Sequence, residues 1–372
     1  MRPLDGTLVL DFSTLLPGPM ATLMLAEAGA EVVKIERPGI GDEMRGYPPS
    51  WGEHGSNFAL LNRGKRSVTL DLKDTASRDR LLPLLRRADV LVEQFRPGVM
   101  DRLGLGFEAV RALNPGIVYC SITGYGQTGP HRLVAGHDLN YIAETGLLAL
   151  GHGSAAQPVV PPALIADIAG GGYPAVINIL LALLARGKDG GAARHLDISM
   201  SDNLFPFLYW AMGQGAVTGQ WPGNATSLVT GGTARYRLYP TADGGMIAAA
   251  PIEDRFWAVF CDTIGLDPAL RDDAKDPAAT VAGVATLIGA RSTAAWRPVL
   301  AEADCCCCAV ASLQDAMQNP HFLARGLFAP GVVSAEGRRM PALPVPIDPA
   351  FRGPPGDRAA PALGADTDAV LG

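Results

Sequence analysis

A histidine and two aspartates occur in a pattern that suits proton transfer. Residues 136–141 read Gly-His-Asp-Leu-Asn-Tyr, so that His137 and Asp138 open an expected helix, and Asp167 opens another. Gly170–Gly172 follow Asp167, and glycines allow a ligand or a second backbone to come close. A carboxylate at a helix N-terminus is stabilised by the helix dipole, and local amides there can hold an oxyanion. Aspartates are also common helix caps, so these residue types alone favour a purely structural role.

Basic residues follow the expected strands at regular places. Arg37 comes after the second strand, Arg96 comes after the fourth, and the segment Arg63–Arg66 precedes the third. In an open parallel sheet the ligand crevice lies outside the carboxyl ends of the strands, so Arg37 and Arg96 are expected to converge there. Cations gathered at such a crevice favour a phosphate-bearing ligand. Solvated surface charge is the alternative.

The elements that must position these residues alternate between strand and helix. This alternation predicts an α/β fold with a parallel sheet and helices on both faces. The turn after the first strand, Ser13–Pro19, holds one glycine between two prolines. A dinucleotide grip needs three glycines at set offsets, so the turn argues against a nicotinamide oxidoreductase, although Glu36 ends the second strand where a ribose-binding acid would sit. The expected strands are Thr7–Phe12, Glu31–Glu36, Ser67–Leu72, Val90–Gln94 and Ile117–Ile122, and the helices are Gly18–Ala28, Thr75–Arg87 and Phe107–Leu113.

Beyond Thr123 the pattern changes. Helices are expected over Asp138–Ala149 and Asp167–Ala185, and a hairpin is expected around Ala242–Gly245. Helices then continue to about Gln318, which predicts a separate, smaller domain. From Pro341 the chain is rich in proline yet apolar, so we expect it to pack across another part of the fold.

Composition limits the class of protein. The chain has 372 residues, of which 48% are apolar and 18% charged, so it is neither disordered nor fibrous. Its net charge of 31 − 37 = −6 argues against a general nucleic-acid binder. No stretch is expected to span a membrane, since the best candidate, Ala175–Ala185, is too short and contains Asn178. No signal-peptide pattern is expected at the start of the chain.

Cysteine usage points to a reducing compartment. Four of the six cysteines are consecutive, Cys305–Cys308, and adjacent residues cannot form a spaced disulfide framework. We therefore expect a cytoplasmic protein. No histidine, cysteine or acid has metal-ligand spacing, so no metal site is expected, and the cysteine run is expected to begin a buried strand or turn.

Several long motifs, in order along nearly the whole chain, resemble the family III CoA-transferases (the CaiB/BaiF superfamily). Within that family the Gly-His-Asp-Leu-Asn-Tyr segment at 136–141 is most similar to the α-methylacyl-CoA racemase branch. The motifs that carry the resemblance lie at 8–13, 17–19, 28–38, 62–67, 88–98, 123–130 and 363–371.

The resemblance implies an interlocked homodimer of two-domain subunits. Residues 1–200 with 330–372 would form a large Rossmann-like CoA-binding domain, and 215–325 a smaller α+β domain, joined by linkers at 200–215 and 325–340. Coenzyme A would enter as part of the substrate, with no permanently bound cofactor. The residues implied in its binding are Arg37, Lys65, Arg66 and Arg96 at the nucleotide and phosphates, Gln94 nearby, and Gly136, Asp138 and Tyr141 near the pantetheine and thioester.

Two chemistries ask different things of Asp167. In a racemase it would share acid–base work with His137 on opposite faces of the α-carbon of a 2-methylacyl-CoA thioester, of the kind found in fatty acid metabolism, with Glu253 of the partner subunit orienting the imidazole. In a CoA-transferase Asp167 would be the nucleophile that passes through anhydride and thioester intermediates. Because a transferase has no need for His137, the resemblance favours the racemase. A CoA-binding protein without catalytic activity is a third possibility.

The acyl group stays open at this level. Apolar residues at helical spacing are as typical of a core as of an acyl surface. Those that qualify are Met200, Phe205, Phe207, Trp210 and Met212.

Overall fold

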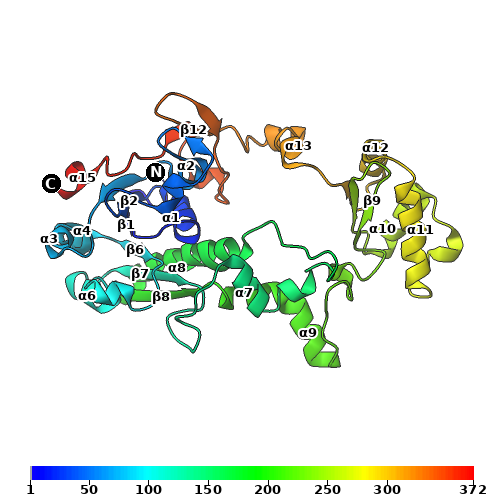
Figure 1. Ribbon diagram of the computed structural model, residues 1–372, viewed down its shortest axis with the longest axis horizontal. Helices are drawn as coiled ribbons and strands as arrows, with labels where there is room; N and C mark the ends of the chain where they lie inside the picture. The colour runs from blue at the N-terminus through cyan, green and yellow to red at the C-terminus, as the bar shows by residue number, and fades with distance from the viewer. Residues whose placement is uncertain (1) are drawn as a thin grey trace. The chain divides into compact units, whose positions relative to one another are not determined.

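A six-stranded parallel sheet organises the first of two units in the computed structural model, which describes residues 2–372 (Figure 1). Its strand order is β5-β2-β1-β6-β7-β8, the doubly wound order in which the chain starts in the middle and reverses direction once. This confirms the predicted parallel α/β sheet. The strands are β1 (Leu8–Asp11), β2 (Glu31–Glu36), β5 (Arg66–Thr69), β6 (Val90–Glu93), β7 (Val118–Thr123) and β8 (Arg194–Ser199).

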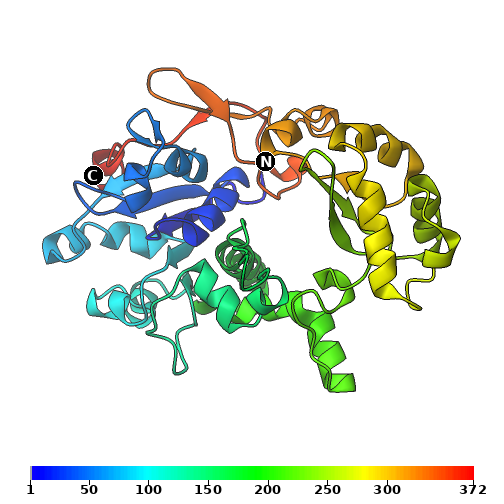
Figure 2. The ribbon, with the colours of Figure 1, turned by 45° about the vertical axis from the view of Figure 1, so that its right-hand side comes forward.

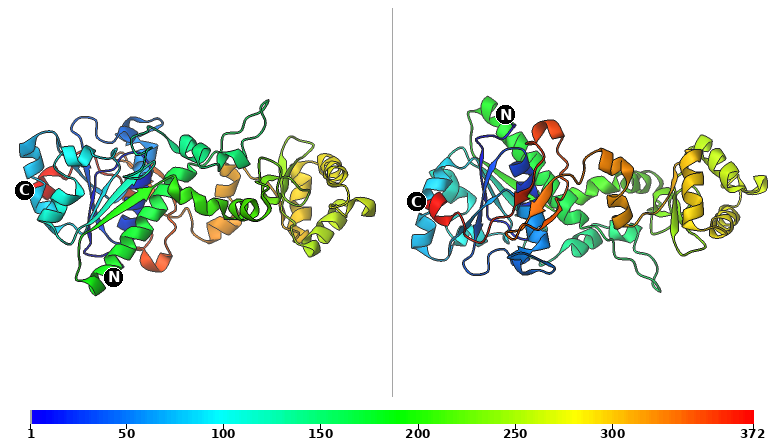
Figure 3. Two further views of the ribbon diagram at one scale, coloured as in Figure 1. Left: turned by 90° about the horizontal axis from the view of Figure 1, so that it is seen from below. Right: turned by 90° about the horizontal axis from the view of Figure 1, so that it is seen from above.

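Helices cover both faces of this sheet (Figure 1). One face carries α1 (Pro17–Glu27) and α8 (Tyr173–Asp189), and Figure 3 shows α8 running alongside β8. The other face carries α3 (Thr75–Asp79), α4 (Leu82–Arg87) and α6 (Phe107–Leu113). Shorter helices α2 (Ser56–Asn62) and α5 (Val99–Arg102) fill the connections.

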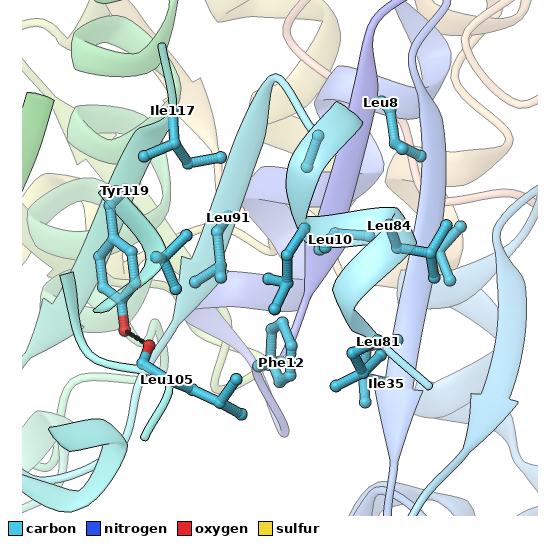
Figure 4. Close-up of a cluster of buried hydrophobic side chains, with 14 of the residues drawn as sticks. Leu8, Leu10, Phe12, Ile35, Leu81, Leu84, Leu91, Leu105, Ile117 and Tyr119 are labelled. Carbon is cyan, nitrogen blue, oxygen red and sulfur yellow. Dashed lines mark hydrogen bonds between the residues drawn. The ribbon is translucent and has the colours of Figure 1, made fainter. Parts of the chain in front are cut away.

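The core beneath α4 and α6 follows the alternation expected of strands. Leu8, Leu10 and Phe12 point to one face of β1, where they pack with Leu84 (Figure 4). The Tyr119 hydroxyl joins this cluster by donating a 3.0 Å hydrogen bond to the carbonyl of Leu105. Residues of the opposite parity, such as Asp11, face α1 instead, and that side holds charged groups described below.

The C-terminal tail packs on the first unit, as its apolar composition predicts. After α14 (Pro320–Ala324), the strands β12 (Gly331–Val333), β13 (Arg339–Pro341) and β14 (Arg358–Ala359) form a small sheet. The last helix, α15 (Thr367–Leu371), lies beside β5 (Figure 2). Asp366 ties it there, because its carboxylate accepts a 2.9 Å bond from the backbone of Ser67.

The second unit is smaller and comprises Gly146–Pro162 and Phe207–Asn319. Its antiparallel sheet, β11-β10-β9, contains the predicted hairpin and packs against a layer of helices (Figure 2). Residues 146–162 were expected in the large domain, whereas their contacts group them with this second unit. Its elements are α9 (Tyr209–Thr218), β9 (Arg237–Pro240), β10 (Met246–Ala249), α10 (Asp254–Ile264), α11 (Pro277–Gly289), α12 (Thr293–Ala303), β11 (Cys307–Ala309) and α13 (Leu313–Met317).

Two predicted helices differ in their boundaries. The helix expected over Asp138–Ala149 is α7 (Asp138–Glu144), which ends before Gly146, a residue with φ of +83°. The helix expected from Asp167 begins with a π-helical turn, Ala166–Gly172, and continues as α8. Gly170 explains the wide turn, since a Cβ there would lie 2.4 Å from the carbonyl oxygen of Met200. The predicted close approach of a second backbone is thus confirmed.

One helix, Ala166–Lys188, is long and apolar enough by length and composition to cross a membrane, which corrects the expectation drawn from Ala175–Ala185. Length and composition are a weak indication of a membrane span, because a core helix packed on a sheet passes the same test, and α8 packs on β7 and β8. One third of its apolar window is buried.

Candidate functional site

A pocket of about 420 Å³ opens at the carboxyl ends of three neighbouring strands. It is lined by residues that directly follow β1, β6 and β7, namely Leu15–Pro17, Gln94–Pro97 and Gly124–Tyr125. The chain runs from β1 first to β2 on one side and later to β6 on the other, so the pocket lies where the order of strands reverses. This is the place where the sequence predicted a ligand crevice.

The pocket brings His137 and Asp167 together, although the two residues are 167 − 137 = 30 positions apart in the chain. His137 is exposed at the start of α7, and its backbone N–H donates a 3.0 Å bond to Asn140 Oδ1. Asp167 lies in the π-helical turn. Burial, reinforced by the negative charge of Asp138, raises the pKa of Asp167 to about 6, and the nearby His137 acts in the opposite direction. A carboxyl group with such a pKa can take or give a proton near neutral pH.

Asp138 contacts the site through the backbone of Asp167, and its implied place near the thioester stays a prediction. Its side chain is buried and does not line the pocket. Its Oδ1 accepts a 3.0 Å hydrogen bond from the backbone N–H of Asp167. Burial raises the pKa of Asp138 as well. Asp138 therefore holds the backbone of Asp167, while the pocket surface is formed by other side chains.

Tyr141 forms one wall of the pocket and explains two glycines. Its ring lies so close to the chain that a Cβ at Gly124 would be 2.4 Å from it, and one at Gly136 would be 2.7 Å from it. The hydroxyl donates a 2.6 Å bond to the carbonyl of Gly136. Burial raises the pKa of Tyr141 to about 12, so the hydroxyl stays a neutral donor. Gly136 thus allows the backbone to pack closely against the Tyr141 ring, which forms this wall of the pocket.

Gln94 braces the turn between β1 and α1. Its Oε1 accepts a 3.1 Å bond from the N–H of Gly18, and its Nε2 donates a 2.5 Å bond to the carbonyl of Thr14. Leu15, at the rim of the pocket, has a left-handed φ of +62°, and its N–H donates to Asp42 Oδ1 at 3.1 Å. A non-glycine residue in this region is strained and must be held by its neighbours. These bonds supply that support.

Lys65 is part of a buried charge network and has no surface to offer a ligand, which corrects its expected place at the CoA phosphates. Its Nζ donates to Asp11 Oδ2 at 3.2 Å, to Thr22 Oγ1 at 2.8 Å and to Asn62 Oδ1 at 2.8 Å. Both side chains of the Lys65–Asp11 pair are fully buried. Burial lowers the pKa of Lys65 to about 8.

The same network supports the β1–α1 turn that borders the pocket. Asp11 accepts a 3.0 Å bond from the N–H of Ser13 and a bond from its hydroxyl. Lys34 pairs with Asp42 at 3.0 Å and donates to the carbonyl of Ser13 at 2.7 Å. Burial opposes the charge of Asp11, but the two lysines more than offset it and lower its pKa. The sequence holds a sign of this structural role: Asp11 of β1 and Lys34 of β2 are neighbours in the sheet and point to the same face of it.

Two arginines line the pocket, Arg96 and Arg132. Neither guanidinium has an ion-pair partner among the side chains that the structure describes, so both are available to a phosphate group. Arg132 was missed by the sequence reasoning, although it is the one arginine in the loop that follows the fifth strand. Arg37 and Arg66 do not line this pocket. Arg37 pairs with Glu43 at 2.9 Å, and Arg66 pairs with Glu31 at 2.8 Å at the amino end of the sheet.

Thr123 and Met200 complete the inner surface of the pocket. The Thr123 hydroxyl is buried, and within the described part of the chain it has no hydrogen-bond partner. Buried hydroxyls are normally paired, so this donor is free for an oxygen atom of a bound molecule. Met200 is the residue of the expected acyl surface that lines this pocket.

The remaining candidates lie in the second unit. Glu253 is exposed at the start of α10, and its place beside a partner's imidazole stays a prediction. Cys305 is buried in the core of this unit, and Cys307, at the start of β11, is half-buried and packs against that core. Cys306 and Cys308 are exposed, so the run fills the core only in part. Among the described residues, no group of histidine, cysteine and acidic side chains is placed to hold a metal ion.

Comparisons with known proteins agree with this architecture. The model of CoA-transferase family III matches residues 4–367. An acetyl-CoA:oxalate CoA-transferase of Acetobacter aceti is 33% identical over 93% of this chain and 89% of its own length. An α-methylacyl-CoA racemase of Mus musculus is also 33% identical, over 99% of this chain and 92% of its own length.

A solved structure is similar over its whole length. The crystal structure of a CaiB/BaiF family protein from Brucella suis superposes with a TM-score of 0.83 at 27% identity, covering 99% of this chain and 98% of that one. Fold, strand order and sequence therefore agree, and the chain belongs to CoA-transferase family III.

Proposed function

We propose that the protein interconverts the two configurations of 2-methylacyl-CoA thioesters. The observation that carries this proposal is the meeting of His137 and Asp167 in one pocket, where burial raises the pKa of Asp167 to about 6. Inversion at the α-carbon requires one group to remove a proton while another returns a proton to the opposite face. An imidazole and a carboxyl group can each take up or release a proton, so the two side chains can exchange these roles.

The remaining pocket residues have roles that follow from their places. Arg96 and Arg132 would bind CoA phosphates at the rim. The free hydroxyl of Thr123 would donate to the thioester oxygen as negative charge develops on the enolate. Asp138 is a positioning residue, since it acts through the backbone of Asp167. Coenzyme A takes part as the carrier of the acyl group, with no further cofactor.

Isotope exchange tests the racemase directly. In deuterium oxide the protein should incorporate label at the α-position of a 2-methylacyl-CoA. His137→Ala should slow this exchange at least about a hundredfold, because one of two proton-transferring groups is lost. His131→Ala is the matched control, since His131 is an exposed imidazole of the same loop that pairs with Glu144 and does not line the pocket. Full exchange in His137→Ala would refute the role of the imidazole.

A CoA-transferase is the second candidate, and relatives of that activity match at the same identity as racemases. Here the Asp167 carboxylate would attack the thioester carbonyl, forming an acyl anhydride and releasing the CoA thiolate. That thiolate would then attack the Asp167 carbonyl of the anhydride, which breaks its C–O bond, releases the substrate acid as a carboxylate and leaves CoA bound to Asp167 as a thioester. Hydroxylamine would attack the Asp167 carbonyl of this enzyme-bound thioester and displace CoA. The resulting Asp167 hydroxamate would be visible by mass spectrometry. Trapping that persists in His137→Ala, together with CoA exchange between acids, would favour this candidate over the racemase.

A further inference from the structure

A second cavity, of about 570 Å³, lies in the first unit and shares no lining residue with the His137–Asp167 pocket. We call it the arginine cavity, because four arginines line it: Arg63, Arg325, Arg352 and Arg358. They come from three segments, the end of α2, the end of α14 and the loop before β14 with the start of that strand. Its volume falls in the range of pockets that hold small molecules, about 300–1,000 Å³.

Arg63 is a built part of this cavity. Its side chain is 5% exposed and is fixed by three bonds, to Glu27 Oε1 at 3.0 Å and to the carbonyls of Leu60 and Leu343 at 2.8 Å each. Each of the three nitrogen atoms of the guanidinium donates one of these bonds, so the Arg63 side chain is held in place and does not turn toward solvent. Its charge is therefore a permanent feature of the cavity wall.

The other arginines are short of partners. Arg358 reaches Glu27 only at 3.8 Å, and Glu27 is already engaged by Arg63. Within the described chain, the guanidinium groups of Arg325 and Arg352 have no hydrogen bond or ion pair. Burial lowers the pKa of Arg63, and the positive charges of Arg358 and Arg352 lower it further. These three cations therefore repel one another around an open space.

The charge count fits a dianion. The cavity is lined by four arginines and two acids, Glu27 and Asp348, so it has an excess of 4 − 2 = 2 positive charges. The Asp348 carboxylate already makes a local hydrogen bond, because its Oδ1 accepts a 2.8 Å bond from the N–H of Ala350. This local excess stands out in a protein whose net charge is −6. A bound anion of two negative charges would neutralise it and remove the repulsion.

We propose that the arginine cavity binds a small organic phosphate, a phosphate monoester or a diphosphate. The planar fork of arginine donates two parallel bonds to phosphate oxygens, and Arg352 and Arg325 have these donors free. Pro354 and Pro355 line the same wall and restrict its backbone. The site is an addition to the acyl-CoA pocket and does not depend on which reaction that pocket performs.

Calorimetric titration with inorganic pyrophosphate tests the site in the full-length protein, without acyl-CoA. Wild-type protein should bind with saturation, and Arg325→Ala/Arg352→Ala should bind at least about tenfold more weakly. Arg80→Ala/Arg86→Ala is the matched control, because both arginines are exposed, lie outside the cavity and change the net charge by the same amount. Arg352→Lys should recover part of the affinity, since it keeps the charge but not the fork.

Three outcomes would place the phosphate somewhere other than the arginine cavity. Unchanged binding in Arg325→Ala/Arg352→Ala would overturn the proposal. Equal loss in the control would also overturn it, because bulk charge would then account for the binding. Loss confined to Arg96→Ala would place the phosphate in the acyl-CoA pocket instead. None of these results bears on deuterium exchange at the α-carbon, so failure here is distinguishable from failure of the proposed function.

Discussion

At the scale of single residues, Asp138 controls Asp167 through both charge and geometry. Its negative charge contributes to the raised pKa of Asp167, and its Oδ1 holds the Asp167 backbone at 3.0 Å. The Asp167 carboxylate, which exists above the pKa of the group, is the nucleophile of the transferase and the base of the racemase in one of its two directions. In those reactions activity should fall as the pH drops through about 6, the pKa of Asp167.

Substituting Asp138→Asn separates these two effects. The amide oxygen can still accept the backbone bond, but the charge is gone, so the pKa of Asp167 should fall. The acidic limb of the kcat/KM profile should then move to lower pH by up to about one unit. Asp138→Ala loses the acceptor too and should lower kcat in addition. An acidic limb that stays in place in Asp138→Asn would contradict the electrostatic part of this argument.

Lys65 provides a second residue-scale prediction, because its burial predicts a role in stability. Lys65→Met leaves Asp11 without one of its two cations, and breaking a buried ion pair costs about 3–5 kcal/mol. The free energy of unfolding should fall by this order, and any rise in KM for acyl-CoA should accompany that loss of stability, because the same network supports the turn that borders the pocket. Arg66→Met is the control, since its partly exposed pairs with Glu31 and Asp366 are worth at most about 1 kcal/mol. A wild-type melting temperature with a raised KM in Lys65→Met would restore the phosphate role.

Lys65 also shows where sequence reasoning stops. A lysine in a loop next to two arginines is usually solvated, and nothing local indicates that it turns inward. Its partner Asp11 is 54 positions away, so the pair exists only once β1 and the loop before β5 are assembled. Strand ends and helix starts have recognisable patterns, and with the family resemblance they singled out His137, Asp167, Gln94 and Arg96. These four residues line one pocket, and their roles stay predictions. The bond from the Asp167 backbone to Asp138 was not predicted, because it depends on the tertiary fold.

At the scale of elements, the turn from β1 into α1 depends on Gly18. A Cβ at this position would lie 2.2 Å from the Ser13 side chain and 2.8 Å from Gln94 Oε1. Gly18 is thus required by close packing. It is the one glycine between Pro17 and Pro19, in the turn that lacks the three glycines of a dinucleotide grip. Gly18→Ala should displace Gln94 and cost about 1–3 kcal/mol of stability.

The measurement is the thermal midpoint together with KM for acyl-CoA, since the displaced turn lines the pocket. Gly187→Ala is the matched control, because Gly187 lies inside α8 with open space around its Cα. Alanine there should be neutral or stabilising by up to about 1 kcal/mol. If Gly18→Ala behaves like Gly187→Ala, the turn does not need the close approach described here.

Elements were predicted well where periodicity is strong and poorly at their ends. The five strands expected before Thr123 all occur in the sheet, whereas their order was not predicted. The end of α7 and the π-helical turn at Ala166–Gly172 were missed. A π-helical turn is set by a neighbour, here the carbonyl of Met200 against Gly170, and a local pattern does not contain that neighbour.

At the scale of the whole molecule, α8 carries an apolar stripe that the first unit does not cover. Ile177 is 56% exposed, Leu181 58% and Leu184 72%, and their spacing places them on one face of the helix. The opposite face packs on the sheet through Ala175, Ile179 and Ala182. Contiguous exposed apolar surface of this kind marks an interface, and it also explains why the helix has the composition of a membrane span.

We therefore predict that this stripe is buried in the homodimer proposed from the family resemblance. Leu181→Glu/Leu184→Glu would place two carboxylates in that interface, where burial of unpaired charge is costly. Light scattering after size-exclusion chromatography should then report a mass near the 38.9 kDa of one chain, against twice that mass for wild type. Ile40→Glu is the control, because Ile40 is 62% exposed in a loop outside α8 and should leave the dimer intact.

Deuterium exchange provides a second measurement on the same variant. If the proposed racemase also takes Glu253 from the partner, the monomeric variant should lose deuterium exchange as well as the dimer. A dimer that survives both carboxylates would remove α8 from the interface and leave its apolar face to be covered by another surface.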